Sequence, residues 1–366
     1  HRSLPHSGPP VPWLQLPGLR VHFPAEAIHQ QVLRPGLPCR CGASAAGARV
    51  ATATASQGLA FMWEELHIAS GMRCPIVMAN ANRALSAPIN IHGDHSDIMG
   101  VRDTGWAMMF AETAQEAYDN TIIAFKVAED PNVLLPVLTT LDGFVTSHAM
   151  DNCVMEEDQV VKDFVGDYKP LYPLLDTENP VGHGMFATLG NGYMKYKLTE
   201  RHALDNALEA FEKHGKEWEE ITGRSFEVVD SWGAEDADYL IVVLGSCAGN
   251  ARHQARLLRA EGKKVGVVRP RIFRPFPAKQ IVEACKNAKA VAVIDRSDSF
   301  GSPHAPLALE VRAAFQDAGL QIPVSDYLAG MGGADITLDQ MGQVYAELEQ
   351  RAQVRMTVPL SILVSK

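Results

Sequence analysis

The 366-residue chain has little of what marks several large classes of protein. Its six cysteines include no C-x-x-C pair, which argues against a disulfide scaffold and against an iron–sulfur or zinc site of its own. No apolar run approaches the ~20 residues that span a bilayer. The net charge of −10 argues against a nucleic-acid-binding surface. A composition of 46% hydrophobic and 21% charged residues is that of a globular protein, and its length predicts two or three domains.

Lysine is absent before Lys126, and acids are nearly absent from the first fifty residues. Those fifty contain one acid, Glu26, and five arginines, a charge of +4, so the other 316 residues carry −14. Eight of the 22 prolines lie in the first 40 residues. Prolines, arginines and histidines interrupt residues 1–41 too often to leave the apolar stretch of a secretory signal. We therefore expect a cytoplasmic protein whose opening segment is foreign in composition to the rest.

Between residues 43 and 150, short apolar runs alternate with helical patterns. We expect strands at 50–54, 76–79, 106–111 and 133–138, and helices at 57–70 and 113–129. Thr113 and Glu116 have the spacing of a capping box. This alternation is typical of βαβ units and a largely parallel sheet.

A second αβ region follows an irregular connection at 150–198. A long helix is expected at 200–222, and its apolar face should consist of Leu204, Leu208, Phe211, Trp218 and Ile221. The second domain should begin near residue 226, with strands at 239–244, 264–268, 290–294 and 324–328 and a last helix capped by Thr337. The fold class is thus α/β, with two domains and mainly parallel sheets.

The turn GSCAG at 245–249 follows an expected strand and opens a helix, a setting that can hold a phosphate. It lacks the G-x-G-x-x-G spacing, and the chain has no P-loop pattern. An ordinary tight turn is therefore favoured over a nucleotide site. Cys74, Cys247 and Cys285 lie in apolar contexts and are expected in the core.

Polar residues cluster where the first strands are expected to end. Arg83 follows the strand at 76–79, and ligands of parallel αβ sheets bind at the carboxyl ends of strands. An arginine there offers a planar fork to a carboxylate or phosphate, although a surface salt bridge is the alternative. Ser56, Gln57 and Gly58 occupy the corresponding place after the strand at 50–54, where Ser56 as a simple helix cap is the alternative. The nearby cluster DHSD at 94–97 is a loop scaffold or a set of substrate contacts, with a metal site as the less favoured interpretation.

These same strings carry a specific resemblance to a known family. TASQGL (54–59), NRALSAP (82–88), DHSD (94–97), RDTG (102–105) and DGFVTSH (142–148) occur in this order, followed by GRSF (223–226), VRPRIFRPFP (268–277) and DR (295–296). Together they resemble the alpha subunit of pyruvate:ferredoxin oxidoreductase, within the 2-oxoacid:ferredoxin oxidoreductase family, from about residue 42 to about residue 349. The resemblance implies a thiamine-diphosphate (pyrimidine-side) domain at 42–150, a connecting segment and long helix at 151–225, a transketolase C-terminal-like domain at 226–350 and a tail at 351–366.

The resemblance also implies the chemistry. Such enzymes use thiamine diphosphate to decarboxylate pyruvate oxidatively, coenzyme A takes the acetyl group, and electrons leave through [4Fe–4S] clusters to ferredoxin or flavodoxin. This chain lacks cluster cysteines and a G-D-G-type motif for the diphosphate and Mg²⁺, so both should sit on beta, gamma and delta (ferredoxin-like) subunits. A lone alpha chain should be inactive. Nucleic acid and membrane are not expected partners.

By the family pattern, Arg83 binds the substrate carboxylate with Asn82 beside it, which agrees with the anion site inferred from position alone. Ser56, Gln57 and Gly58 match a cofactor-proximal loop, and Asp94, His95 and Asp97 match an active-site loop, with no metal ligand among them. The string at 82–88 favours pyruvate over 2-oxoglutarate, because relatives of the latter class usually carry a QRGGPSTG-type string there. Oxalate and branched-chain 2-oxo acids remain alternatives.

One departure from the family concerns its catalytic glutamate, which activates the cofactor and lies about nine residues before the glycine that matches Gly42. Leu33 occupies that position, and leucine cannot exchange a proton. With the composition of the opening segment, this predicts that residues 1–41 are non-native, from an out-of-frame or truncated reading. The alternative is a genuine but catalytically silent, scaffolding alpha-like chain.

Overall fold

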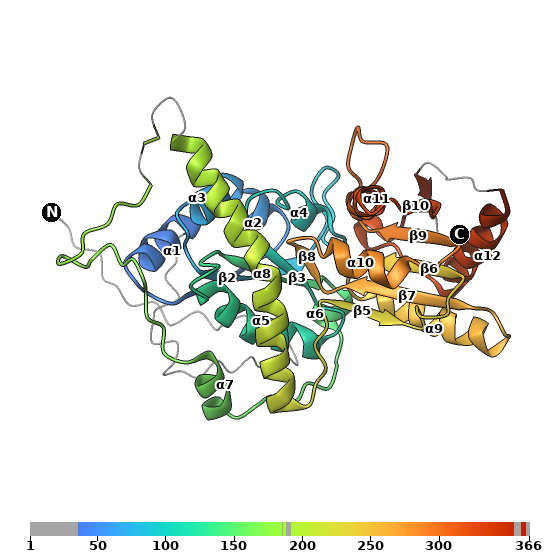
Figure 1. Ribbon diagram of the computed structural model, residues 1–366, viewed down its shortest axis with the longest axis horizontal. Helices are drawn as coiled ribbons and strands as arrows, with labels where there is room; N and C mark the ends of the chain where they lie inside the picture. Colours follow the sequence, from blue (N-terminus) through green and yellow to red (C-terminus); the bar gives the residue numbers. More distant parts are fainter. Residues whose placement is uncertain (1–35, 185, 188–191, 355–359, 364–366) are drawn as a thin grey trace, which may run out of the picture.

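The computed structural model describes residues 36–184, 186–187, 192–354 and 360–363, and forms two αβ domains side by side along its long axis (Figure 1). The first domain has a five-stranded sheet in the order β1-β2-β4-β3-β8. Its strands are β1 (Val50–Thr54), β2 (Ile76–Asn82), β3 (Ala107–Phe110), β4 (Val137–Asp142) and β8 (Ile272–Arg274). Only β8 in this sheet is antiparallel to its neighbour.

The second domain has a six-stranded sheet in the order β11-β10-β9-β6-β7-β5. Its strands are β5 (Val229–Trp232), β6 (Tyr239–Val243), β7 (Val265–Pro270), β9 (Ala290–Asp295), β10 (Val324–Leu328) and β11 (Ser361–Ile362). All pairs are parallel except β5 with β7. The prediction of two domains with mainly parallel sheets is confirmed.

Helices fill the connections and cover the sheets (Figure 1). In the first domain they are α1 (Gly36–Ala45), α2 (Gln57–Ala60), α3 (Trp63–Gly71), α4 (Ser96–Met99), α5 (Ala114–Glu129), α6 (Val145–His148), α7 (Asp158–Val165) and α8 (Gly192–Thr222). In the second they are α9 (Cys247–Ala260), α10 (Ala278–Cys285), α11 (Pro306–Asp317), the 3-10 turn η1 (Met331–Gly333) and α12 (Leu338–Val354). Every helix in the described ranges is too short or too polar to form a membrane span.

Several boundaries differ from the sequence predictions. The helix expected at 57–70 is two helices, α2 and α3, broken at residues 61–62. The strand expected at 133–138 starts four residues later, because 133–135 belong to the apolar loop that leads into β4. The antiparallel strands β5 and β8 were not predicted. Thr113 caps α5 as expected, but the Glu116 carboxylate accepts from the Glu112 amide, one residue outside the capping-box pattern.

The long helix α8 crosses the first domain and packs on α5 (Figure 1). Its buried face differs from the prediction: Phe211 and Trp218 are buried, but Ile221 is 48% exposed. Alanines at 203, 207 and 210 are buried in that face. Their small side chains allow α8 to approach the domain closely, so the larger residues Leu204 and Leu208 lie only at the margin of the contact.

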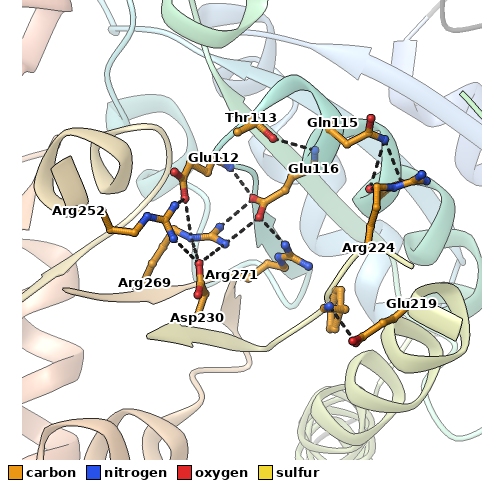
Figure 2. Close-up of polar contacts among 12 residues, drawn as sticks. Glu112, Thr113, Gln115, Glu116, Glu219, Arg224, Asp230, Arg252, Arg269 and Arg271 are labelled. Carbon is orange, nitrogen blue, oxygen red and sulfur yellow. Dashed lines mark hydrogen bonds and ion pairs between the residues drawn. The ribbon is translucent and has the colours of Figure 1, made fainter. Parts of the chain in front are cut away.

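A network of charged residues joins the domains at the start of α5 (Figure 2). The buried Arg269, at the end of β7, contacts carboxylates of Glu112, Glu116 and Asp230. Arg271 pairs with Glu116 as well. Burial alone would raise the pKa of Glu116, but Arg269 and Arg271 outweigh it and lower the pKa to about 2. The VRPRIFRPFP string thus supplies cations that hold the second domain on the first.

Candidate active site

The parallel register brings the carboxyl ends of β1, β2 and β4 to one edge of the first sheet. Thr54 pairs with Asn80, and Asn82 pairs with Asp142. The residues that follow these strands therefore lie together, although they are far apart in sequence. Because β2 continues to Asn82, Arg83 directly follows its strand.

Arg83 is half-buried, and in the part of the chain that the structure describes its guanidinium has no ion pair or hydrogen bond. Its Nε is buried and unpartnered. The side-chain stem lies on Gly143, where an added Cβ would come within 2.8 Å of Arg83 Cγ. A half-buried arginine without a counter-ion is suited to binding an anion, because its desolvated charge has no internal partner.

Asn82 lies beneath this surface. It is fully buried, its Nδ2 donates to Thr140 Oγ1 at 3.1 Å, and its Oδ1 accepts from Asn80 Nδ2 at 2.8 Å. The amide therefore joins β2 to β4 and supports the strand end that carries Arg83.

Asp97 connects the ends of β1 and β2. Its Oδ2 accepts from the amides of Ser56 at 2.8 Å and Arg83 at 3.1 Å and from Asn80 Nδ2 at 3.0 Å. Burial raises the pKa of Asp97 to about 6, against the lowering effect of these donors. One carboxylate oxygen therefore holds both the loop that follows β1 and the loop that follows β2.

The loop after β1 is held against the loop after β2. Ser56 is buried, its backbone has a positive φ of 51°, and its Oγ donates to the Ala84 carbonyl at 2.6 Å. Gln57 Nε2 donates to Ser86 Oγ at 2.8 Å. Gly58 lies in α2, where a Cβ would come within 2.7 Å of Thr54 Oγ1. Ser56 caps no helix through its side chain, which removes the simple-cap alternative.

The DHSD cluster is a scaffold that reaches the second domain. Asp94 accepts from the Gly332 amide at 2.9 Å, and His95 Nε2 lies 2.6 Å from Asp142 Oδ1. Asp142 Oδ2 in turn lies 3.0 Å from Arg296 Nη1 and accepts from the Ser246 amide at 2.9 Å. The motifs at 94–97, 142–148 and 295–296 thus meet between the domains.

The carboxylate of Asp142 is the anion that the GSCAG turn binds. Burial would raise its pKa, but His95, Arg296 and the hydrogen bond from Ser246 lower it well below the usual range of a carboxyl group. The Ser246 amide and hydroxyl both bind this carboxylate. The turn is therefore occupied by the protein's own anion, as the tight-turn interpretation favours. Asp142, Ser246 and Arg296 were not singled out as site residues, although each lies in a quoted string.

No group of three or more His, Cys, Asp or Glu side chains that could hold a metal ion occurs in the described ranges. The three carboxylates of the edge, Asp94, Asp97 and Asp142, are all engaged by protein donors. All six cysteines are free, and Cys74, Cys247 and Cys285 are buried as predicted. Leu33, at the expected position of the catalytic glutamate, lies outside the described residues.

Two family profiles match the chain. "Pyruvate flavodoxin/ferredoxin oxidoreductase, thiamine diP-bdg" matches residues 39–217, and "Pyruvate:ferredoxin oxidoreductase core domain II" matches residues 237–341.

Individual relatives agree with the profiles. The chain is 44% identical over 306 residues to pyruvate synthase subunit PorA of Thermotoga maritima, covering 84% of this chain and 78% of that protein. It is 38% identical over 331 residues to ketoisovalerate oxidoreductase subunit VorA of Pyrococcus horikoshii, covering 90% and 82%. The solved 2-oxoglutarate:ferredoxin oxidoreductase of Magnetococcus marinus has the same fold at 18% identity, with a TM-score of 0.61 over 85% of this chain and 55% of that chain.

Proposed function

The chain belongs to the pyruvate:ferredoxin oxidoreductase family, and we propose that its complex converts pyruvate and coenzyme A to acetyl-CoA and CO₂ while it reduces ferredoxin. Within that complex it is the alpha subunit of a thiamine-diphosphate-dependent oxidoreductase. The resemblance that the motifs predicted is thereby confirmed.

The observation that carries the proposal is the unpartnered guanidinium of Arg83 at the carboxyl edge of the first sheet. A 2-oxo acid presents a planar carboxylate, which matches the two parallel N–H groups of an arginine fork. Binding there holds the keto group in a fixed place beside the Ser56–Gln57 loop, which Asp97 joins to Arg83.

The proposed substrate is pyruvate rather than a larger 2-oxo acid. The string NRALSAP at 82–88 supports this, as do the pyruvate synthase relatives at up to 44% identity. The ketoisovalerate oxidoreductase relative at 38% identity supports a branched-chain 2-oxo acid as the second candidate. Oxalate is the third.

Thiamine diphosphate, when bound, supplies the carbanion for attack on the keto carbon and stores the electrons of the reaction. We propose that the loop of Ser56, Gln57 and Gly58 borders its pyrimidine side. Mg²⁺, the diphosphate and the [4Fe–4S] clusters belong on beta, gamma and delta partners. Since Asp94, Asp97 and Asp142 are engaged by protein donors, none of them replaces the glutamate that activates the cofactor.

The opening segment bears on activity. The sequence predicts that residues 1–41 are non-native; we propose the narrower segment before residue 36, which includes Leu33, and sequencing of the locus tests this. An intact single reading frame through the junction would overturn it. The helix α1 begins at Gly36, and its Leu37 and Cys41 are buried in the first domain, so the departure lies before this helix.

The assay is reduction of methyl viologen by the chain, carrying the N-terminal sequence that the locus encodes, co-expressed with beta, gamma and delta subunits, with pyruvate, 2-oxoisovalerate or oxalate as substrate. We expect the highest kcat/KM with pyruvate and no activity from the lone chain. A preference for 2-oxoisovalerate would overturn the substrate. An assembled complex that reduces viologen with none of the three would favour the scaffolding alternative.

A further inference from the structure

Arg296 comes from the second domain but contacts both loops beside Arg83. It directly follows β9, is 4% exposed, and its Nη1 lies 3.0 Å from Asp142 Oδ2. Its Nη2 donates to the Gly93 carbonyl at 2.8 Å, and its own carbonyl accepts from the His95 amide at 3.0 Å. One guanidinium therefore joins Gly93, at the start of the DHSD loop, to Asp142, the last residue of β4, from which the turn at Gly143 begins.

These two loops are in direct contact against the Arg83 stem. A Cβ at Gly93 would come within 2.2 Å of the Gly143 carbonyl oxygen, and one at Gly143 within 2.8 Å of Arg83 Cγ. The Gly143 amide donates to the Asn82 carbonyl, and the Ala84 amide donates to the His92 carbonyl. Arg83 is thus enclosed by backbone on two sides, and Arg296 holds both sides.

From this geometry we propose that Arg296 is a positioning residue for Arg83, a role that rests on the proposed binding of a 2-oxo acid. Arg296 does not itself contact substrate, because it is buried and its charge is paired with Asp142. It acts by fixing Gly93 and Asp142 and, through them, the orientation of the Arg83 fork. Ser246 assists, because its amide and hydroxyl bind the same Asp142 carboxylate.

Only an arginine can make this set of contacts. Two different nitrogens of the guanidinium bind the two acceptors: Nη1 binds Asp142, and Nη2 binds the Gly93 carbonyl. The Gly330 carbonyl oxygen also lies 3.4 Å from Nη2. A lysine ammonium is a single point and cannot span them. Arg296→Lys keeps the charge beside Asp142 but should release the Gly93 loop.

Arg269 provides a matched control. It is also a buried arginine of the second domain that binds carboxylates of the first, but its partners lie at the start of α5 (Figure 2). Arg269→Lys therefore perturbs the joint between domains without contacting the loops around Arg83. A general loosening of the domains predicts equal kinetic effects of the two variants, whereas a positioning role predicts unequal ones.

The experiment compares Arg296→Lys, Ser246→Ala and Arg269→Lys in the complete complex. We expect Arg296→Lys to raise KM for pyruvate about tenfold or more, with KM for coenzyme A unchanged within about twofold. Ser246→Ala should give a smaller rise in the same direction, because the Ser246 amide still binds Asp142. Arg269→Lys should leave both KM values within about twofold of wild type. Equal rises in Arg296→Lys and Arg269→Lys, or none in Arg296→Lys, would overturn the proposal.

Hydrogen exchange on the full-length chain decides the same question without turnover. In Arg296→Lys we expect faster exchange of the Ala84 and Gly143 amides than in wild type, and in Arg269→Lys no change there. Unchanged exchange in Arg296→Lys would overturn the proposal. If the wild-type complex does not use pyruvate, the proposed function fails, and the exchange rates still decide whether Arg296 holds these loops.

Discussion

Arg83 and Arg269 show how differently the same side chain is used in this protein. Arg269 is buried among three carboxylates, which neutralise it. Arg83 faces no carboxylate in the described part of the chain and keeps a buried, unpartnered Nε. The first arrangement stabilises the joint between domains, and the second leaves a cation available for a ligand at some cost in stability.

Substitution of Arg83 tests that use. We expect Arg83→Ala to raise KM for pyruvate about a hundredfold, and Arg83→Lys about tenfold, because lysine keeps the charge but loses the bidentate fork. KM for coenzyme A should remain unchanged. Arg201→Lys, on the exposed side of α8, is the matched control and should match wild type. Steady-state kinetics of the complex that show no change in Arg83→Ala would contradict the anion site.

Asp295 predicts a pH dependence of stability. It is fully buried at the end of β9 and accepts from the Leu307 and Ala308 amides at the start of α11. Burial, with a smaller contribution from Asp326, raises its pKa from 3.8 to about 8. The folded protein therefore holds a proton between about pH 4 and pH 8 that the unfolded chain has lost, so stability falls as pH rises through this window.

Asp295→Asn should remove this contribution. We expect the free energy of unfolding of the variant to increase relative to that of wild type as pH rises from 6 to about 8, because only wild type loses stability there, and the difference should level off above pH 8. Urea unfolding at half-unit pH steps measures the difference. Parallel pH curves for the two proteins would contradict the assignment.

Helix α8 shows what a helical pattern can and cannot predict. The helical periodicity predicts that the helix exists, and the glycine at 223 predicts where it ends. In the structure Gly223 has the positive φ, 71°, that ends a helix and that glycine adopts readily. The residues that form its closest contacts do not follow, because they are set by the distance to α5, which no local pattern encodes. The buried alanines indicate that this distance is short.

Two helical glycines give a matched test of packing against propensity. A Cβ at Gly215 in α8 would lie 2.0 Å from Phe226 Cδ1, whereas at Gly342 in α12 the nearest atom is the flexible Gln254 Nε2 at 3.0 Å. We expect Gly215→Ala to destabilise by about 2 kcal/mol through overpacking. Gly342→Ala should be neutral or stabilise by up to about 1 kcal/mol through helix propensity. Thermal unfolding of both variants checks this, and a stabilised Gly215→Ala would contradict the packing.

The edge strands β5 and β8 mark where local patterns fail. Ile272–Arg274 belongs by sequence to the second half but pairs antiparallel with β3 in the first sheet. A segment of three residues between prolines is too short to show the alternating pattern of a strand. Its partner strand also lies about 160 residues earlier in the sequence, as the Met109–Ile272 pair shows. The longer apolar strands β6, β9 and β10 were predictable because each is buried over its whole length or nearly so.

The two domains share part of their hydrophobic core. One hydrophobic cluster includes Phe110 of β3, Phe273 of β8 and residues of the second sheet such as Val268. Arg83, Ser56 and the DHSD cluster could be found from sequence because each follows a recognisable strand or forms a compact string. The connection from Asp142 to Ser246 and Arg296 could not, because it depends on how the two domains dock.

The network in Figure 2 predicts how that docking responds to acid. Glu116 binds Arg269 and Arg271 and has its pKa lowered to about 2, so its contribution to stability is complete above about pH 4.5 and is lost as pH falls toward 2. Glu116→Gln removes the charge and leaves both arginines with fewer acceptors. We expect a loss of about 2–4 kcal/mol at pH 7, below the upper end for a broken buried pair because Glu112 and Asp230 remain.

Urea unfolding of the wild type and Glu116→Gln at pH 7 and at pH 3 measures this contribution. Because protonation of Glu116 removes the same charge as the substitution, the difference between the two proteins should be smaller at pH 3 than at pH 7. Glu209→Gln makes the same change in net charge on an exposed position of α8 and should follow wild type at both pH values. A difference between wild type and Glu116→Gln that does not depend on pH would mean that the side chain acts through packing, and would remove the electrostatic account of how the domains are joined.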